Sequence, residues 1–327
     1  MGSNFNRFLC LCLFIFCTTA SYANGIFSDT TRAYAVPTLT RTQTGDVALS
    51  WTEKANDGTV YFYWAKSGDK GRTFGDKKLI YASSGLANSR LMRPKLLFRP
   101  NGSAVAVFGL RSSESPVPVA ATSAPAAEHA GHDAHAGGHT ATKAEAPKGP
   151  QGSRGGGRPR SQQIVYVTSA DGGTTWTQPA PVHSDKTPNV MRGFFDATVL
   201  ANGEVAVTWL NDVPGNEHEQ RDLRFVATSG GKFGVERTVD PYVCACCNIS
   251  LLVDLAGALH LYYRENQDNI RDIAEMRSTD NGKTFSKSQI LSKDNWQING
   301  CPHSGPTASA GGGSPLVAWF SGTTDSP

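Results

Sequence analysis

The sequence predicts an all-β chain folded as a β-propeller, and three features of its 327 residues lead to this fold class. One turn motif recurs along the chain, one strand pattern recurs at an even spacing, and helical periodicity is almost absent. Short, evenly spaced strands with turn signals between them are typical of propeller blades, in which each small antiparallel sheet is one repeat.

The turn motif S-x-D-x-G-x-T-[WF] occurs three times without a mismatch, at residues 67–74, 169–176 and 278–285. Its aspartate can accept backbone N–H groups within a hairpin turn, and its glycine permits a positive φ. We expect the closing aromatic side chain to pack each turn against its own blade. A degraded fourth copy is expected at residues 229–233.

The strand pattern is a polar or glycine-containing bend followed by an apolar strand that ends in an aromatic residue. Successive aromatic ends are separated by 57, 101, 53 and 57 positions, and they are Trp51, Phe108, Trp209, Tyr262 and Trp319. Five blade units are therefore predicted. Because the chain stops soon after Trp319, we expect the last blade to be incomplete, unless the N-terminal strand closes the ring.

The long interval between Phe108 and Trp209 contains residues 112–160, which are rich in Ala, Pro, Gly, Ser and His and have no apolar periodicity. Removing this stretch restores the repeat spacing. We therefore predict a disordered insertion within a single propeller domain. The insertion contains a histidine tract made of His129, His132, His135 and His139.

The N-terminus has the layout of a secretory signal: Arg7, an apolar run over residues 8–16, and small residues ending at Ala23. We predict cleavage after Ala23, which assigns residues 1–23 to the signal and residues 24–327 to the propeller. Lipid attachment at Cys17 is an alternative, although Phe16 stands where such a site needs a small side chain.

The signal predicts a secreted or periplasmic protein without membrane insertion, because no stretch approaches the roughly 20 apolar residues of a membrane helix. The 31 basic and 28 acidic side chains nearly balance, so no nucleic-acid partner is expected.

The repeated turn resembles the Asp-box of the sialidase-like, bacterial neuraminidase repeat superfamily. This resemblance covers nearly all of the chain outside the insertion and the signal, and it implies a six-bladed propeller. It also raises the possibility of an exo-sialidase, which would hold a substrate carboxylate with three arginines, use a tyrosine paired with a glutamate as nucleophile, and use an aspartate as acid/base.

Candidates for this sialidase machinery are present: Arg93, Arg192, Arg264, Tyr262, Glu265 and Asp196. The family's Arg-Ile-Pro element ahead of the first Asp-box is absent, however, and the substitute Arg93-Pro94 follows that box. An arginine in a blade also has an ordinary structural interpretation as a solvated or salt-bridged side chain. A sialidase-type glycoside hydrolase is therefore kept as a rival, because fold alone does not establish activity.

The feature that departs from the family is a set of cysteines and a histidine in two motifs. Residues 244–247 (C-A-C-C) come directly before an apolar strand, and residues 301–303 (C-P-H) precede the corresponding strand of the next repeat. Cys247 lies 15 positions before Tyr262, and His303 lies 16 before Trp319. Both motifs therefore enter the same face of neighbouring blades, where they can meet at the mouth of the central funnel.

These motifs predict a metal site formed by Cys244, Cys246, Cys247, Cys301 and His303. Thiolate and imidazole donors favour Cu(I) or zinc over magnesium or calcium. Because adjacent residues of an extended chain point to opposite sides, we expect only one of Cys246 and Cys247 to join a mononuclear site, whereas a two-metal cluster could use both.

The competing interpretation is a structural disulfide, for example from Cys244 or Cys246 to Cys301, in which case no cofactor is present. The histidine tract favours the metal interpretation, since such tracts collect borderline metals and would serve as accessory ligands.

The function expected from the sequence is an exported copper-binding propeller for storage, delivery or detoxification, with another exported metal-handling protein as a possible partner. Whether the chain is an enzyme stays open: a redox enzyme that uses the same site is an alternative beside the glycoside hydrolase, but the sequence identifies no substrate. A glycan-binding or protein-binding scaffold with structural disulfides is a further alternative.

Overall fold

The computed structural model describes residues 26–111, 162–213, 221–311 and 313–323. The predicted signal, the predicted insertion with its histidine tract, and residues 324–327 lie outside the described residues. Within the described part, every ladder between strands is antiparallel. The same part of the chain contains no helix with the length and apolar character needed to cross a membrane.

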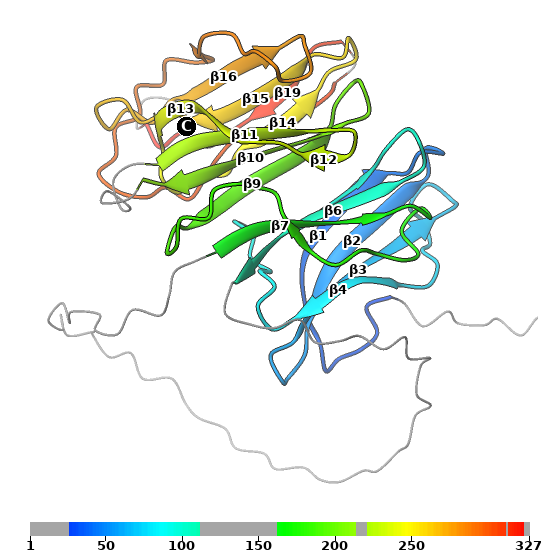
Figure 1. Cartoon of the computed structure of the whole chain (residues 1–327). Helices are drawn as coiled ribbons and strands as arrows, with labels where there is room; N and C mark the ends of the chain where they lie inside the picture. Colours follow the sequence, from blue (N-terminus) through cyan, green and yellow to red (C-terminus); the bar gives the residue numbers. More distant parts are fainter. Residues whose placement is uncertain (1–25, 112–161, 214–220, 312, 324–327) are drawn as a thin grey trace, which may run out of the picture.

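The strands form successive sheets along the chain, as the repeat predicts (Figure 1). The first sheet contains β1 (Ala33–Arg41), β2 (Val47–Lys54), β3 (Val60–Ser67) and β4 (Lys78–Ser83). The second contains β5 (Lys95–Phe98), β6 (Ala104–Arg111), β7 (Gln162–Ser169) and β8 (Ala180–Pro181). The third contains β9 (Arg192–Val199), β10 (Val205–Asp212), β11 (Arg221–Ser229), β12 (Lys232–Phe233) and β13 (Arg237–Val243).

The fourth sheet contains β14 (Ser250–Val253), β15 (Leu259–Arg264), β16 (Ile273–Ser278) and β17 (Gln289–Ile290). A fifth sheet has two described strands, β18 (Thr307–Ser309) and β19 (Leu316–Ala318). The all-β propeller architecture is thus confirmed. The number of blades in a closed ring stays a prediction.

The first strand of each sheet lies on the inside, since β1, β5, β9, β14 and β18 contact one another in sequence order. The recurrent aromatic residues belong to the second strands, where Trp51, Phe108, Trp209 and Tyr262 are almost fully buried. The predicted insertion falls between β6 and β7, whose ladder begins at the pair Arg111 and Gln162. Residues 112–160 therefore interrupt one hairpin and leave its strand pairing in register.

The three Asp-box turns share one hydrogen-bond pattern. In the second copy, Gly173 N donates to Ser169 Oγ over 2.7 Å and Thr175 N donates to Asp171 Oδ1 over 2.9 Å. The corresponding bonds recur in the first and third copies. These bonds favour the ionised carboxylate and lower the pKa of the aspartate, to about 2 at Asp69.

The later Asp-boxes also contact the preceding blade, which the sequence did not predict. Trp64 Nε1 of β3 donates to the carbonyl oxygen of Gly173 over 3.0 Å. In the third box, Phe285 packs edge-on against Phe225 of β11, with ring centroids 5.0 Å apart. Each of these turns therefore joins two neighbouring sheets.

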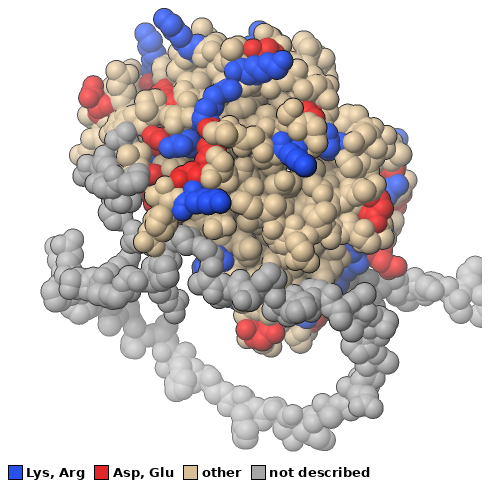
Figure 2. Space-filling view, in the orientation of Figure 1, with Lys and Arg blue, Asp and Glu red and all other residues tan. Residues whose placement is uncertain are grey.

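Basic and acidic side chains are interspersed on the face shown in Figure 2, with broad uncharged areas between them. This view agrees with the near balance of charges in the sequence. On this face no large field of one sign is present to attract nucleic acid.

Replacing Gly173 with alanine is expected to destabilise the fold. Gly173 has a φ of 94°, and a Cβ there would lie 2.7 Å from the Trp64 ring. We predict a loss of about 1–3 kcal/mol of unfolding free energy, measured by urea denaturation. The matched control is Gly68→Ala in the first box, where an added Cβ meets nothing within 4 Å. Equal stability of the two variants would contradict the proposed contact between blades.

Candidate metal centre

Two segments that connect blades bring the cysteines together. The cysteine loop (residues 244–249) leads from β13 to β14, and the C-P-H segment (residues 301–306) leads into β18. Because β14 and β18 are neighbouring inner strands, both segments reach the same end of the sheets. Val243 forms a bridge with Glu265, and Cys244 N donates to the carbonyl oxygen of Arg264 over 3.0 Å, which fixes the start of the cysteine loop.

The cysteine loop is turned at Ala245 and Cys246 and is not extended. The sulfur atoms of Cys244, Cys246 and Cys247 consequently lie within 4.8 Å of one another. The expectation that Cys246 and Cys247 point to opposite sides was wrong for this reason. The rule for alternating side chains holds for a strand, whereas a turn gathers consecutive side chains on one side.

The five predicted donors form two groups of three that share one sulfur. Cys246, Cys301 and His303 make up the second group, whose donor atoms also lie within 4.8 Å of one another. Cys246 therefore stands between the other two cysteines of its own loop and the two donors of the C-P-H segment.

Burial differs sharply between the two sides of Cys246. Cys244, Cys246 and Cys247 are 1%, 5% and 2% exposed and belong to the apolar cluster that also contains Phe194 and Tyr263. Cys301 and His303 are exposed. All four described cysteines carry free thiols. One side of the centre thus faces the protein core and the other faces solvent.

A close backbone contact holds the C-P-H segment against the cysteine loop. A Cβ at Gly305 would overlap the backbone of Asn248, so only glycine allows this approach without a shift. His303 has a φ of 49°, a conformation that non-glycine residues adopt infrequently. Strained backbone at a candidate ligand is a common feature of functional sites.

Arg264 ties the same segment to the fourth sheet. Its Nε donates to the carbonyl oxygen of Ser304 over 2.9 Å, and its Nη2 donates to that of Phe320 over 2.8 Å. Its guanidinium also donates to the carbonyl of Arg271 and stacks on the Trp296 ring at 4.9 Å. Arg264 is buried, and its hydrogen-bonding groups are occupied by the protein itself.

The thiols influence one another's protonation. The neighbouring Cys246 and Cys247 side chains lower the pKa of Cys244, and the positive charge of Arg271 adds to this effect. The pKa values of Cys246 and Cys247 are raised, first by their bonds to Cys244 and then by burial.

A central cleft of about 590 Å³ adjoins the exposed side of the centre. Inner strands β5, β9, β14 and β18 supply its walls, and His303 lines it together with Arg90 and Arg93. Lys95 Nζ contacts Asp196 Oδ1 at 2.5 Å across the wall of the cleft. The cleft gives solvent and small solutes a route to His303.

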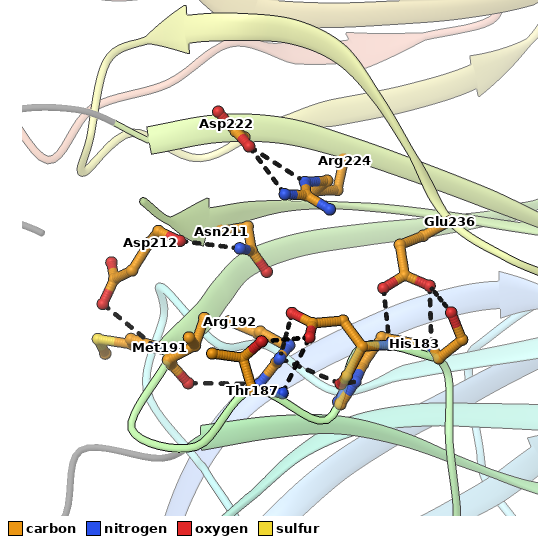
Figure 3. A network of polar contacts seen from close by, with 12 residues as sticks. His183, Thr187, Met191, Arg192, Asn211, Asp212, Asp222, Arg224 and Glu236 are labelled. Atoms are coloured by element: carbon orange, nitrogen blue, oxygen red, sulfur yellow. Dashed lines mark hydrogen bonds and ion pairs between the residues drawn. The ribbon is translucent and has the colours of Figure 1, made fainter. Parts of the chain in front are cut away.

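The three arginines considered for a sialidase do not gather at this cleft. Arg93 lines it, whereas Arg264 is bonded to backbone carbonyls as described above. Arg192 is buried and donates to Asp185 Oδ2 over 2.8 Å and to the Asp185 carbonyl oxygen over 3.1 Å. Figure 3 shows Arg192 in this polar network with Thr187 and His183.

The remaining sialidase candidates also have structural partners. Tyr262 stacks on His260, and it is the adjacent Tyr263 whose hydroxyl lies 3.0 Å from Glu265 Oε1 and 2.8 Å from Asp240 Oδ2. Burial and the nearby Asp240 raise the pKa of Glu265. Asp196 accepts a hydrogen bond from Leu251 N over 2.9 Å and thereby links β9 to β14.

Sequence reasoning missed the residues that support the centre. Gly305 could have been identified from the sequence, because it lies in the same short motif as Cys301 and His303. Arg271 could not have been found in this way, because it lies in the connection between β15 and β16, outside both motifs, and comes near Cys244 only in the folded chain. The accessory histidines of the insertion lie outside the described residues.

Comparison with known proteins identifies the repeat and the fold. Residues 147–301 match a family described as a BNR repeat-like domain. The structure is similar to an intramolecular trans-sialidase from Ruminococcus gnavus, with 14% identity, a TM-score of 0.50, and coverage of 82% of this chain and 73% of that one.

Two further similar structures are those of an arabinanase and an arabinofuranosidase. The first is the α-L-arabinanase of Penicillium chrysogenum, with 11% identity, a TM-score of 0.50, and coverage of 88% of this chain and 76% of that one. The second is an α-L-arabinofuranosidase of Fusarium graminearum, with 10% identity, a TM-score of 0.50, and coverage of 84% of this chain and 68% of that one. No curated protein matched the sequence significantly. These similarities establish the fold, and the site must be judged on its own residues.

The burial difference predicts selective thiol modification. In the reduced, metal-free protein, Cys301 should react with a maleimide at least about ten-fold faster than Cys244, Cys246 or Cys247, because reactivity requires access as well as a thiolate. Mass spectrometry of digested samples measures each rate. In a Cys301→Ser variant the fast phase should disappear. A fast reaction at Cys247 would contradict the packing described here.

Proposed function

We propose that this chain, a β-propeller of the sialidase-like BNR-repeat superfamily, is an exported protein that binds Cu(I) through Cys244, Cys246, Cys247, Cys301 and His303. The observation that carries the proposal is the position of Cys246, whose sulfur is close to two further thiols on one side and to Cys301 and His303 on the other. The predicted secretory signal supports export to the periplasm or the medium.

The donor set supports copper over the alternatives. Four thiols and one imidazole select soft or borderline ions. Structural zinc sites are four-coordinate, whereas the donors here fall into groups of three. Three-coordinate binding by thiolates suits Cu(I), so zinc is the second choice of metal.

The surroundings support a role in holding and passing on an ion. The exposed Cys301 and His303 permit exchange with a partner at the cleft, while the buried thiols protect a bound ion from water. We propose storage, delivery or detoxification of copper, with another exported metal-handling protein as donor or acceptor. The histidine tract of the insertion would collect ions nearby.

A glycoside hydrolase is the second candidate, and one observation favours it. Arg90 and Arg93 line the central cleft, and in the described part of the chain neither guanidinium forms an ion pair. An anionic sugar would find two basic groups there. Arg192 and Arg264 are engaged elsewhere, which makes a three-arginine site of the sialidase type the weaker proposal.

Replacing Cys246 with serine should weaken Cu(I) binding by more than about 100-fold, since losing even an outer-shell partner commonly costs 10-fold to 100-fold in affinity. Anaerobic competition with a chromogenic Cu(I) chelator measures the affinity. Ala245→Ser in the same turn is the matched control and should bind like the wild type. Unchanged affinity in Cys246→Ser, with circular dichroism showing a folded protein, would overturn the proposal.

Gly305→Ala should lower the Cu(I) affinity by roughly ten-fold or more without removing a donor, because the added methyl group displaces the C-P-H segment from the cysteine loop. The same chelator competition is used. Gly300→Ala is the control, because a Cβ there meets nothing within 4 Å. Equal affinities in the two variants would show that the approach of the two segments does not matter for binding.

A further inference from the structure

We infer that the centre holds two Cu(I) ions bridged by the Cys246 thiolate: an inner ion on Cys244, Cys246 and Cys247, and an outer ion on Cys246, Cys301 and His303. This inference rests on the proposed function and extends it from one ion to two ions with different tasks. It assigns each donor to a position and identifies the ion that a partner exchanges.

The first argument is geometric. Each group of three has all its donor atoms within 4.8 Å of one another, and the two groups have only Cys246 in common. A single ion bound by one group would leave two donors of the other group without a metal. A thiolate sulfur has enough lone pairs to bind two soft ions at once, so sharing Cys246 completes both positions.

The second argument concerns charge. Binding two Cu(I) ions to four thiols releases four protons and leaves a cluster with a net charge of −2, with no change in oxidation state. The buried Arg264 lies beside this charge, because its carbonyl oxygen accepts from Cys244 N and its guanidinium donates to the carbonyl oxygen of Ser304 in the C-P-H segment.

The third argument is the contrast in exposure across Cys246. The inner position is enclosed by side chains that are 1–5% exposed and lies in the apolar cluster between the third and fourth sheets. The outer position has two exposed donors, and its histidine lines the central cleft. The inner ion therefore stays with the protein, and the outer ion is the one exchanged through the cleft.

The test is an anaerobic titration of the full chain with Cu(I) in the presence of the competing chelator, followed by copper X-ray absorption. To exclude ions held by the insertion, His129, His132, His135 and His139 are replaced by glutamine in every sample. We expect two tightly bound ions per chain and a short copper-to-copper scattering path at full loading.

Variants of the outer position separate the two ions. Cys301→Ser and His303→Ala should each bind one ion and lose the copper-to-copper path, while Ser309→Ala, an exposed control on β18, keeps both ions. The surviving ion should be surrounded by sulfur alone. Because Cys301 and His303 are exposed, these variants are expected to fold, and circular dichroism checks this.

The outcomes distinguish the inference from the proposed function. One ion per chain in the wild type, retained at the same affinity in Cys301→Ser, would overturn the two-ion centre and leave copper binding intact. One ion in the wild type that Cys301→Ser loses would also overturn it, in favour of a mononuclear site. No tightly bound copper in any sample would overturn both proposals.

Discussion

The candidate centre depends on the close packing of Gly305 against the backbone of Asn248. Without a side chain at Gly305, the C-P-H segment can approach the cysteine loop closely enough for Cys301 and His303 to reach Cys246. Arg264 holds the segment in this position by bonding to the carbonyl oxygens of Ser304 and Phe320. The candidate donors are thus positioned by backbone packing and by one buried guanidinium, both contributed by the junction of two blades.

The propeller explains why this junction is available. A chain that passes from the outer strand of one sheet to the inner strand of the next places every such connection at the same end of the blades. The cysteine loop and the C-P-H segment are consecutive connections of this kind, so residues far apart in sequence become neighbours. The trans-sialidase and the arabinanase to which this structure is similar share the fold, and a fold alone does not decide the chemistry of a site.

The repeat made the fold predictable, because the Asp-box turns and the aromatic strand ends follow local rules. The meeting of Cys246 with Cys301 also followed from the sequence, since both motifs stand at nearly the same distance before matching strands. The closeness of the Cys246 and Cys247 sulfur atoms could not be predicted from the sequence. It depends on a turn that the residue pattern does not distinguish from a strand. The roles of Arg264 and Arg271 were equally hidden, since they arise from strand pairing and from packing across blades.

The central claim is that the four thiols are kept free in order to hold metal. Its most direct test is elemental analysis combined with a free-thiol count on the protein purified anaerobically from the compartment to which the predicted signal would direct it. The account predicts stoichiometric copper and four thiols that become reactive only after the metal is stripped. Protein without metal, in which Cys246 and Cys301 are joined by a disulfide, would contradict the account and would make the cysteines structural links between blades.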